Sequence, residues 1–380
     1  MPRTPLGDGR PSPRPRWLTR PLVALAALVV VAGLAGVPAA GTDARGDNSF
    51  TQTNLVSNRD GIPAQIHDPA LRNAWGLSAS PTSPLWVSDN AADATTLYSK
   101  AVPGLKVSPG GVAAIAVEGG APTGQVFNTG DFLAHNADRT VSAKAAFIFA
   151  TENGTIAAWS PTVDLATAHK EVDNGANAVY KGLAIASSGG QTYLYAANFR
   201  SGRIEVYDST YTPVALAGLF TDFQVPAAYA PFNIQELGGK LYVAYARRDD
   251  QLKDDEPGHG HGFVDVFSTD GHLIRRLVQH GDLNSPWALA LAPAGFGHFA
   301  GALLVGNFGN GRINAYNATN GTPLGALRGT DGSPIAIDGL WGLRFGNGTS
   351  FGTNELVFSA GPNDEVDGLL GTLTFTASTS

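Results

Sequence analysis

The chain has 380 residues, including 47 Gly and 24 Pro, and 43% of its residues are apolar while 15% are charged. The ordinary apolar fraction disfavours intrinsic disorder, and the Gly content is too low for a collagen. Because the chain contains no Cys, disulfides, thiolate zinc sites and cysteine nucleophiles are excluded. The composition is typical of a loop-rich β protein.

Residues 1–39 have the character of an export signal. They contain five Arg residues, and an uncharged run extends over 21–40. The small side chains before this point predict cleavage after Ala39, or after Ala40 as second choice. An uncleaved membrane anchor is the alternative interpretation, but Gly33 and Pro38 interrupt the apolar run.

Removal of residues 1–39 changes the charge of the chain. It leaves 20 basic and 31 acidic side chains, a formal charge of −11, so nucleic acid is not expected as a partner. We expect a secreted or extracytoplasmic monomer without a membrane segment after cleavage. Residues 40–49 are interpreted as a linker and 377–380 as a polar tail.

An internal repeat is the strongest pattern in the remaining chain. The repeat starts are Trp75-Gly76-Leu77, Lys181-Gly182-Leu183, Phe232-Asn233-Ile234, Trp287-Ala288-Leu289 and Trp341-Gly342-Leu343. The successive steps from Trp75 through Gly182, Asn233 and Trp287 to Trp341 are 107, 51, 54 and 54 residues. Because the first step is about twice as long as the others, one repeat start lies within it. The segment 123–128 supplies it, which gives six repeats.

Each repeat start leads into further short runs that are typical of strands. Second runs include Leu85-Trp86-Val87 and Leu303-Leu304-Val305, and third runs such as Val264-Asp265-Val266-Phe267 alternate as half-buried strands do. Short polar turns separate them. The pattern predicts an all-β fold, a six-bladed β-propeller with four antiparallel strands in each blade. A pair of β-sandwiches is the competing architecture, but it gives no reason for the constant spacing.

A ring of blades requires that its two ends be joined, since an open sheet edge would otherwise remain. The last repeat supplies strands at 341–345, 355–359 and 369–375 and lacks a fourth. The segment 50–56 has the length and pattern to fill that place. We therefore predict a single propeller domain over 50–376, closed by the N-terminal strand in the last blade.

Several motifs resemble known families. The turn Asn307-Phe308-Gly309-Asn310-Gly311-Arg312-Ile313, with the Trp-Gly-Leu strand, resembles the NHL-type propeller repeat. The segments 54–57, 73–77, 262–267 and 300–309 look like an uncharacterised family of exported bacterial proteins, and the resemblance covers essentially the whole chain after the signal. It implies a propeller and export, with no established activity.

Candidate ligand-binding residues are expected on one face of the propeller. The start of each inner strand and the loop between the second and third strands lie at the same rim, where propellers usually bind ligands. The residues placed on this rim are Asn73, Trp75, Asp89, Asn90, Asn198, Trp287, Asn307 and Trp341. The alternative is structural, since Asn and Asp favour turns and Trp fills cores.

The fourth repeat departs from the regular spacing by about 11 extra residues in the loop 247–261, on the same rim. This loop contains the candidate metal ligands Asp249, Asp250, Asp254, Asp255, Glu256, His259 and His261. Carboxylates are the ligands that Ca²⁺ prefers, and the two imidazoles suit a transition metal. A solvated charged loop is the alternative interpretation.

Two classes of function remain open. The first is a binding or interaction module that recognises a protein, glycan or small molecule at the rim. The second is a Ca²⁺-dependent hydrolase of the lactonase or gluconolactonase kind, in which an axial cation activates water. Only Asp89 and Glu152 are placed to supply an acidic ligand to the channel, so the sequence leaves enzymatic activity undecided.

Overall fold

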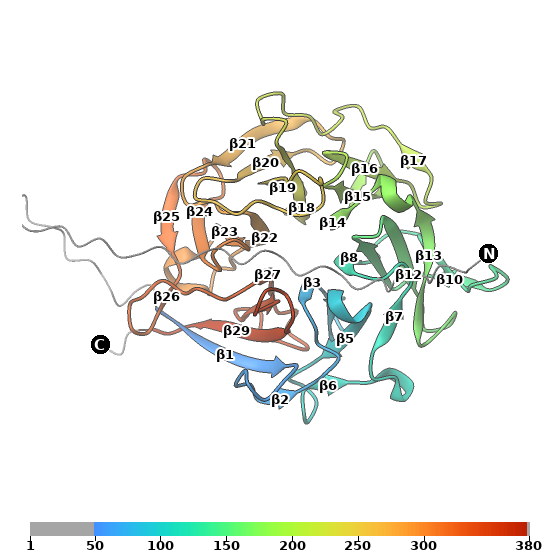
Figure 1. Cartoon of the computed structure of the whole chain (residues 1–380), viewed down its shortest axis with the longest axis horizontal. Helices are drawn as coiled ribbons and strands as arrows, with labels where there is room; N and C mark the ends of the chain where they lie inside the picture. Colours follow the sequence, from blue (N-terminus) through green and yellow to red (C-terminus); the bar gives the residue numbers. More distant parts are fainter. Residues whose placement is uncertain (1–48, 378–380) are drawn as a thin grey trace, which may run out of the picture. The chain divides into compact units, whose positions relative to one another are not determined.

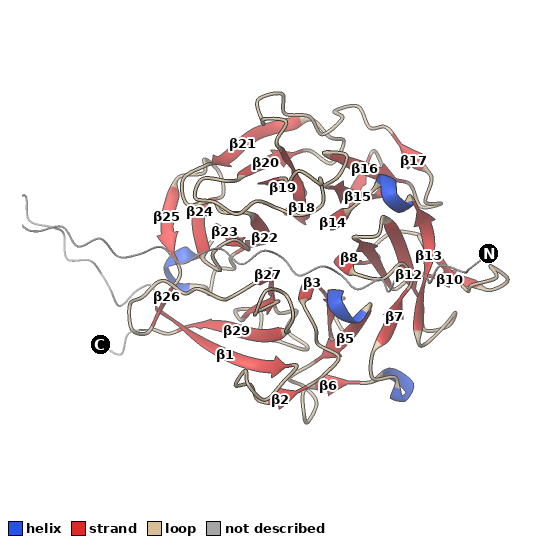
Figure 2. Cartoon of the chain, in the orientation of Figure 1, coloured by secondary structure: helices blue, strands red, loops and turns tan. Residues whose placement is uncertain are grey.

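The computed structural model describes residues 49–377, whose regular secondary structure is mainly β-strand (Figure 2). Four short 3-10 helices lie among the strands of this part: η1 (Asn90–Ala92), η2 (Pro109–Gly111), η3 (Gly175–Asn177) and η4 (Gly297–Phe299). Within residues 49–377, no helix has the length and apolar character needed to span a bilayer. The predicted signal peptide over 1–39 lies outside the described residues.

Three sheets each contain four antiparallel strands that follow one another in the chain. The first sheet consists of β14 (Tyr180–Ser188), β15 (Gln191–Asn198), β16 (Arg203–Tyr207) and β17 (Pro213–Val214). The second consists of β18 (Tyr229–Leu237), β19 (Lys240–Arg247), β20 (Phe263–Phe267) and β21 (Leu273–Gln279). The third consists of β22 (Pro286–Leu291), β23 (Ala302–Asn307), β24 (Ile313–Asn317) and β25 (Pro323–Ala326). These sheets confirm the four-stranded repeat predicted for this part of the chain.

A nine-stranded sheet joins two such meanders, in the order β3-β4-β5-β7-β13-β12-β11-β8, with β6 paired to β5. Its first half contains β3 (Ala74–Ser78), β4 (Leu85–Asp89), β5 (Ala94–Tyr98), β6 (Lys106–Val107) and β7 (Ile115–Val117). Its second half contains β8 (Pro122–Phe127), β11 (Phe147–Thr151), β12 (Thr155–Trp159) and β13 (Thr167–Asp173). A separate hairpin is formed by β9 (Leu133–His135) and β10 (Ser142–Lys144).

The joint between the two halves is the parallel pair β7 and β13, and an ionic contact reinforces it. His169 lies on β13 between Glu118 and Asp164, with 3.0 Å from Nδ1 to Glu118 Oε1 and 3.0 Å from Nε2 to Asp164 Oδ2. Burial alone would lower the pKa of His169, but the two carboxylates outweigh burial and raise this pKa above its ordinary value of 6.5. The imidazolium therefore stabilises the joint.

We expect His169→Gln to lower the free energy of unfolding at low pH only. A raised pKa in the folded state contributes stability below the unfolded pKa, and this contribution is lost as the pH rises through the folded pKa. Urea unfolding at about pH 5.5 should show a deficit of at most about 1 kcal/mol, which should disappear at about pH 8.5. His272→Gln is the matched control, because His272 pairs with Asp270 at the surface. An equal deficit of His169→Gln at both pH values would contradict the ionic role.

The last sheet brings together the two ends of the described chain, in the order β2-β1-β29-β28-β27, with β26 also paired to β1. Its strands are β1 (Ser49–Ser57), β2 (Ile66–His67), β26 (Arg328–Gly329), β27 (Leu340–Phe345), β28 (Leu356–Ala360) and β29 (Leu369–Phe375). The antiparallel ladder of β1 and β29 places Phe50 opposite Phe375 and Ser57 opposite Leu369. The predicted pairing of the N-terminal strand in the last repeat is confirmed.

The sheets are arranged around a common centre (Figure 1). The innermost strands contact one another in the cyclic order β3, β8, β14, β18, β22 and β27, and β27 returns to β3. Glycine permits this close approach: a Cβ on Gly124 would lie 2.3 Å from the Leu183 nitrogen, and one on Gly182 would lie 2.3 Å from Asn233 Oδ1. The fold is therefore all-β and propeller-like.

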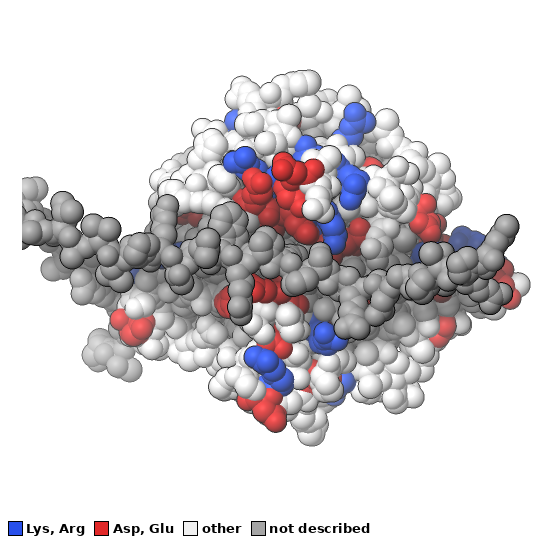
Figure 3. Space-filling view, viewed as in Figure 1, with Lys and Arg blue, Asp and Glu red and all other residues white. Residues whose placement is uncertain are grey.

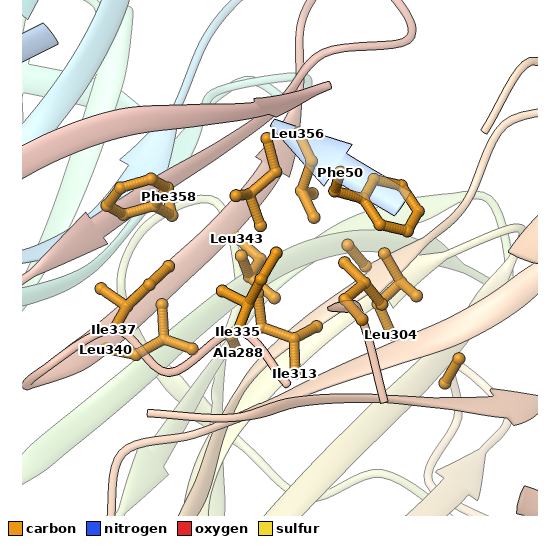
Figure 4. Close-up of a cluster of buried hydrophobic side chains, with 14 of the residues drawn as sticks. Phe50, Ala288, Leu304, Ile313, Ile335, Ile337, Leu340, Leu343, Leu356 and Phe358 are labelled. Atoms are coloured by element: carbon orange, nitrogen blue, oxygen red, sulfur yellow. The ribbon is translucent and has the colours of Figure 1, made fainter. Parts of the chain in front are cut away.

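The hydrophobic core is divided into layers between neighbouring sheets. One layer packs Phe50 of β1 and Leu356 of β28 against Ala288 and Leu304 of the preceding sheet (Figure 4). The alternating strand pattern turns one face of each sheet toward one neighbour and the other face toward the next. Buried side chains on each sheet therefore stabilise the contact of that sheet with its neighbours.

Candidate ligand site at the starts of the inner strands

Three indole rings meet where the inner strands β3, β22 and β27 begin. Trp75 stacks on Trp341 with ring centroids 3.5 Å apart, and Trp287 contacts both rings edge to face at 5.9 and 5.8 Å. Phe308 stacks on the other side of Trp341 at 3.9 Å. All three indoles are buried, so they form an aromatic floor across the centre of the ring.

A buried ammonium group lies over this floor. Lys181 at the start of β14 is 2% exposed, and its Nζ lies 5.1 Å from the centre of the Trp75 ring. The same Nζ donates to Glu152 and, at 3.3 Å, to Asp254 Oδ1. Burial alone would lower the pKa of Lys181, but the charges of Glu152 and Asp254 outweigh it and raise this pKa above its ordinary value. The side chain is therefore a charged ammonium that balances buried carboxylates.

Amide side chains connect this ion pair to a further carboxylate. Asn73 Nδ2 donates to Glu365 Oε2 at 2.9 Å and to Asn90 Oδ1 at 3.2 Å, and Asn90 Nδ2 donates to Glu152 Oε2 at 3.2 Å. Trp341 Nε1 in turn donates to Asn73 Oδ1 at 3.0 Å. Burial raises the pKa of the Glu365 carboxyl. One hydrogen-bonded network therefore links the aromatic floor to the charged groups above it.

We define Glu152, Lys181, Asp254 and Glu365 as the axial cluster. With all four groups ionised, three carboxylates face one ammonium, so the cluster carries a net charge of −2. Asp254 keeps 42% of its side chain exposed, which gives the cluster an edge in contact with solvent. Asp and Glu side chains also gather near the centre of one face of the molecule (Figure 3). These features suit the binding of a cationic group.

The structure divides the eight predicted rim residues into two groups and leaves Asp89 apart. Asn73, Asn90 and the three Trp residues meet at the floor and in the network described above. Asn198 instead accepts from Val179 N at 3.2 Å and donates to Glu205 at 2.6 Å, and Asn307 donates to the Asp282 carbonyl at 2.7 Å. Their amides hold turns, as the structural alternative expected.

Asp89 lies apart from the axial cluster. It ends β4, its side chain is fully buried, and neither carboxylate oxygen has a hydrogen-bond partner among the described residues. Burial raises the pKa of Asp89 well above its ordinary value, and the charge of Asp68 raises it further. Of the two acidic residues expected at the channel, only Glu152 belongs to the axial cluster.

The loop 247–261 does not bring its predicted metal ligands together. Asp254 pairs with Lys181, Glu256 pairs with Arg247 at 2.8 Å, and His261 Nδ1 contacts the Glu256 carbonyl at 3.0 Å. Burial raises the pKa of Asp255 to about 6. Within residues 49–377, no group of three or more His, Asp or Glu side chains has an arrangement that could hold a metal ion. Asp254, Glu256 and His261 instead contact basic groups or main-chain atoms, each separately.

Of the remaining ligand candidates of this loop, Asp249 is held by the loop's own backbone. Asp249 Oδ1 accepts from Lys253 N at 2.9 Å, and Asp249 N donates to the Asp254 carbonyl at 2.8 Å. Asp250 and His259 are exposed. Binding of Ca²⁺ or another ion by this loop stays a prediction.

Sequence reasoning missed Lys181 and Glu365 as site residues. Lys181 occupies the position that holds Trp75, Phe232, Trp287 and Trp341 in four other repeats. A charged residue at a position that is aromatic in most repeats is the sequence signal that could have identified Lys181 as a site residue. Glu365 gave no comparable signal, because the loop after β28 follows no repeated pattern.

Comparisons with known proteins identify relatives without a known activity. No family model matches the chain. An uncharacterized protein of Acanthamoeba polyphaga mimivirus is 36% identical over 332 residues, covering 84% of this chain and 78% of the relative. A second uncharacterized protein of the same virus is 33% identical over 335 residues and covers 84% of both chains. The bacterial origin implied by the resemblance stays a prediction, since these relatives are viral.

Solved structures give a likeness of fold only. A structural genomics protein of unknown function from Bacteroides thetaiotaomicron aligns with a TM-score of 0.50 and 10% identity, covering 86% of this chain and 76% of that one. A streptogramin B lyase aligns with a TM-score of 0.48 and 13% identity, covering 86% of this chain and 97% of the lyase. By sequence, the chain belongs to the same family as the two uncharacterized mimivirus proteins.

Proposed function

We propose that the chain is an exported, six-bladed propeller that binds a ligand at the axial cluster. The cyclic contacts among the inner strands support six blades, because each of the six begins one repeat of about 53 residues. The arginine-rich start and the uncharged run over 21–40 support export and a secreted location. The propeller domain then extends over 50–376.

The observation that carries the ligand proposal is a single buried ammonium among three carboxylates above an aromatic floor. A net negative cluster suits an amine or guanidinium, since carboxylates pair with its charge. The ligand is therefore a small molecule, or the side chain of a protein, that carries a cationic group. Asp254 and Glu365 are its direct contacts, because Glu152 already holds both Lys181 and Asn90.

Calorimetric titration of the full chain tests this proposal. We expect 1,4-diaminobutane and methylguanidinium to bind and the uncharged 1,4-butanediol not to bind. Glu365→Gln removes one charge without changing the shape of the side chain, and we expect about tenfold weaker binding of the amine, a change of about 1.4 kcal/mol. The control is Glu236→Gln, in an exposed position at the end of β18. Equal binding of the diol and the diamine would contradict the proposal.

The hydrolase alternative rests on Glu152, the one acidic residue that reaches the axial cluster as expected. It requires a cation such as Ca²⁺ to activate water. In the structure the Lys181 ammonium lies between Glu152 and Asp254, where that cation would otherwise neutralise the carboxylates. A Ca²⁺ arm of the same titration distinguishes the two functions, because tight Ca²⁺ binding that is lost in Glu152→Gln would favour the hydrolase.

A further inference from the structure

The sheet β14–β17 has an outer strand of only two residues. β17 pairs with Val206 and Tyr207 of β16, so no strand within residues 49–377 pairs with the outer edge of β16 over 203–205. In the next sheet, by contrast, β21 pairs along the whole of β20, from Phe263 to Phe267. The open edge belongs to the outer strands of its sheet, whereas the axial cluster lies where the inner strands begin. It is therefore distinct from the site proposed above.

The chain leaves this edge because the segment after β17 bonds to the neighbouring sheet instead. Gly218 N donates to the Asp270 carbonyl at 3.0 Å, and Phe220 N donates to the Gly271 carbonyl at 3.1 Å, in the turn between β20 and β21. A cavity of about 960 Å³ remains beside the edge of β16, and its other lining residues come mainly from the segment 213–229. The place of a longer fourth strand is thus open to a ligand.

The main chain of Ile204 has unused hydrogen-bonding groups at this edge. Further along the same edge, Asp208 N donates to the Thr212 carbonyl at 3.0 Å. Main-chain groups that face one edge of a strand recur at every second residue, so those of Val206 and Ile204 face this edge as well. The Ile204 groups form no hydrogen bond there with any residue of the described chain. Ile204 is partly exposed and lines the cavity, so a ligand can reach it.

The corresponding edge of the sheet β22–β25 is filled by the chain itself. The turn 307–313 repeats the turn 198–204, so Ile313 corresponds to Ile204. The Ile313 carbonyl accepts from Leu327 N at 2.9 Å, and the Leu327 side chain is fully buried in the core layer behind it. An extended segment with a buried leucine therefore occupies the place that is open beside Ile204.

The unpaired charges at the open edge are positive. Arg203 and Arg248 both line the cavity, and neither forms an ion pair with a carboxylate of the described chain. Arg248 donates instead to the main-chain carbonyls of Arg200, at 2.9 Å, and Ala227, at 2.6 Å. A Cβ on Gly202 would lie 3.4 Å from Arg248 Nη1, so both guanidinium groups belong to the start of β16.

The carboxylates that line the same cavity are already satisfied. Glu205 accepts from Asn198 Nδ2 at 2.6 Å and from the Tyr207 hydroxyl at 3.0 Å. Asp222 Oδ2 pairs with Arg276 Nη2 at 2.5 Å. The charge left for a ligand to neutralise is therefore that of the two arginines, which favours an acidic partner.

We propose that the open edge of β16 binds an extended, acidic peptide of a partner protein as an added fourth strand. The main chain of Ile204 holds the peptide, as Ile313 holds Leu327. The peptide residue opposite Ile204 is apolar, because its side chain lies on the same face as Ile204 and covers the partly exposed Leu216 and Val225. An antiparallel peptide continues the line of β17, so its next residue lies opposite Arg203 and is acidic.

Fluorescence anisotropy of the full chain with a labelled peptide Ser-Thr-Leu-Glu-Ser-Thr tests this proposal. We expect saturable binding. Methylation of the leucine nitrogen should weaken binding at least about tenfold, because it removes the hydrogen bond to the Ile204 carbonyl and blocks close pairing of the strands. Replacement of the peptide's leucine by serine should have an effect of about the same size, since it removes the apolar contact. These comparisons leave the protein unchanged.

A charge comparison locates the peptide on the protein. Replacement of the peptide's glutamate by glutamine should weaken binding to the wild type about threefold and should make no difference to binding by Arg203→Gln. Arg312→Gln is the matched control, because Arg312 holds the same place in the repeated turn beside an edge that is already filled. This variant should bind both peptides as the wild type does.

Several outcomes would overturn the proposal. These are equal binding of the N-methylated peptide, no binding at millimolar concentration, or an unchanged preference for glutamate in Arg203→Gln. Displacement of the peptide by 1,4-diaminobutane at constant ionic strength would also overturn it, because the peptide would then lie at the axial cluster. The other results are independent of the axial cluster, whose probes are small cations.

Discussion

Replacement of Lys181 by Met is expected to lower the free energy of unfolding by about 3–5 kcal/mol, because it leaves buried carboxylates without their ammonium partner. Glu152 and Glu365 would then repel each other above the aromatic floor. Unpaired buried carboxylates take up protons more readily in the folded state, so the deficit should shrink as the pH is lowered from about 7 to about 5. Urea unfolding at several pH values measures both effects.

Lys170→Met is the matched control for this change. Lys170 pairs with Asp173 at 2.9 Å, but both side chains are about half exposed, at 42% and 53%. Exposed ion pairs contribute little to stability, so the control should cost at most about 1 kcal/mol and show no rescue at low pH. Equal losses in the two variants would show that Lys181 is not balancing buried charge.

Deletion of residues 50–57 is expected to abolish cooperative unfolding. This strand pairs with β29 along its length and contributes to two core layers, through Phe50 on one side and Leu55 and Val56 on the other. Its loss opens a sheet edge and removes apolar contacts worth several kcal/mol, against a net stability of about 5–15 kcal/mol. Circular dichroism during thermal unfolding measures the outcome.

Point substitutions within the same strand test which of its residues contribute to stability. Leu55→Ala should cost about 2–5 kcal/mol, because Leu55 is 1% exposed and a cavity would remain. Gln52→Ala should leave stability unchanged within about 0.5 kcal/mol, since Gln52 is exposed on the same strand. An unchanged unfolding transition after the deletion would refute the closure of the ring by β1.

Much of the fold could be predicted because the repeat is local. The spacing of Trp75, Trp287 and Trp341 placed the inner strands, and the missing fourth strand of the last repeat identified β1 as its partner. The axial cluster could not be predicted in the same way. Its charged residues come from four separate repeats, and only the packed ring shows which side chains turn inward.

The loop 247–261 shows the same limit. Its acidic residues were candidate metal ligands, but a sequence does not show which basic groups a folded chain will place beside them. Arg247 lies within the loop and pairs with Glu256, whereas Lys181 begins β14 of the preceding sheet and pairs with Asp254. The surroundings of these carboxylates therefore depend on how the folded chain places its basic groups, which composition alone does not predict.

The pairing of β1 with β29 also has a consequence for the order of folding. Phe50 and Phe375 lie at opposite ends of the described chain and yet form one ladder, so this ladder cannot form until synthesis has passed residue 375. Contacts between such distant residues form slowly, and strands that wait for a partner expose their edges. The earlier sheets can assemble from neighbouring segments while β1 remains unpaired. During synthesis, closure of the ring is therefore the last of these pairings to become possible, and β1 is the segment that must be kept from pairing with other chains until then.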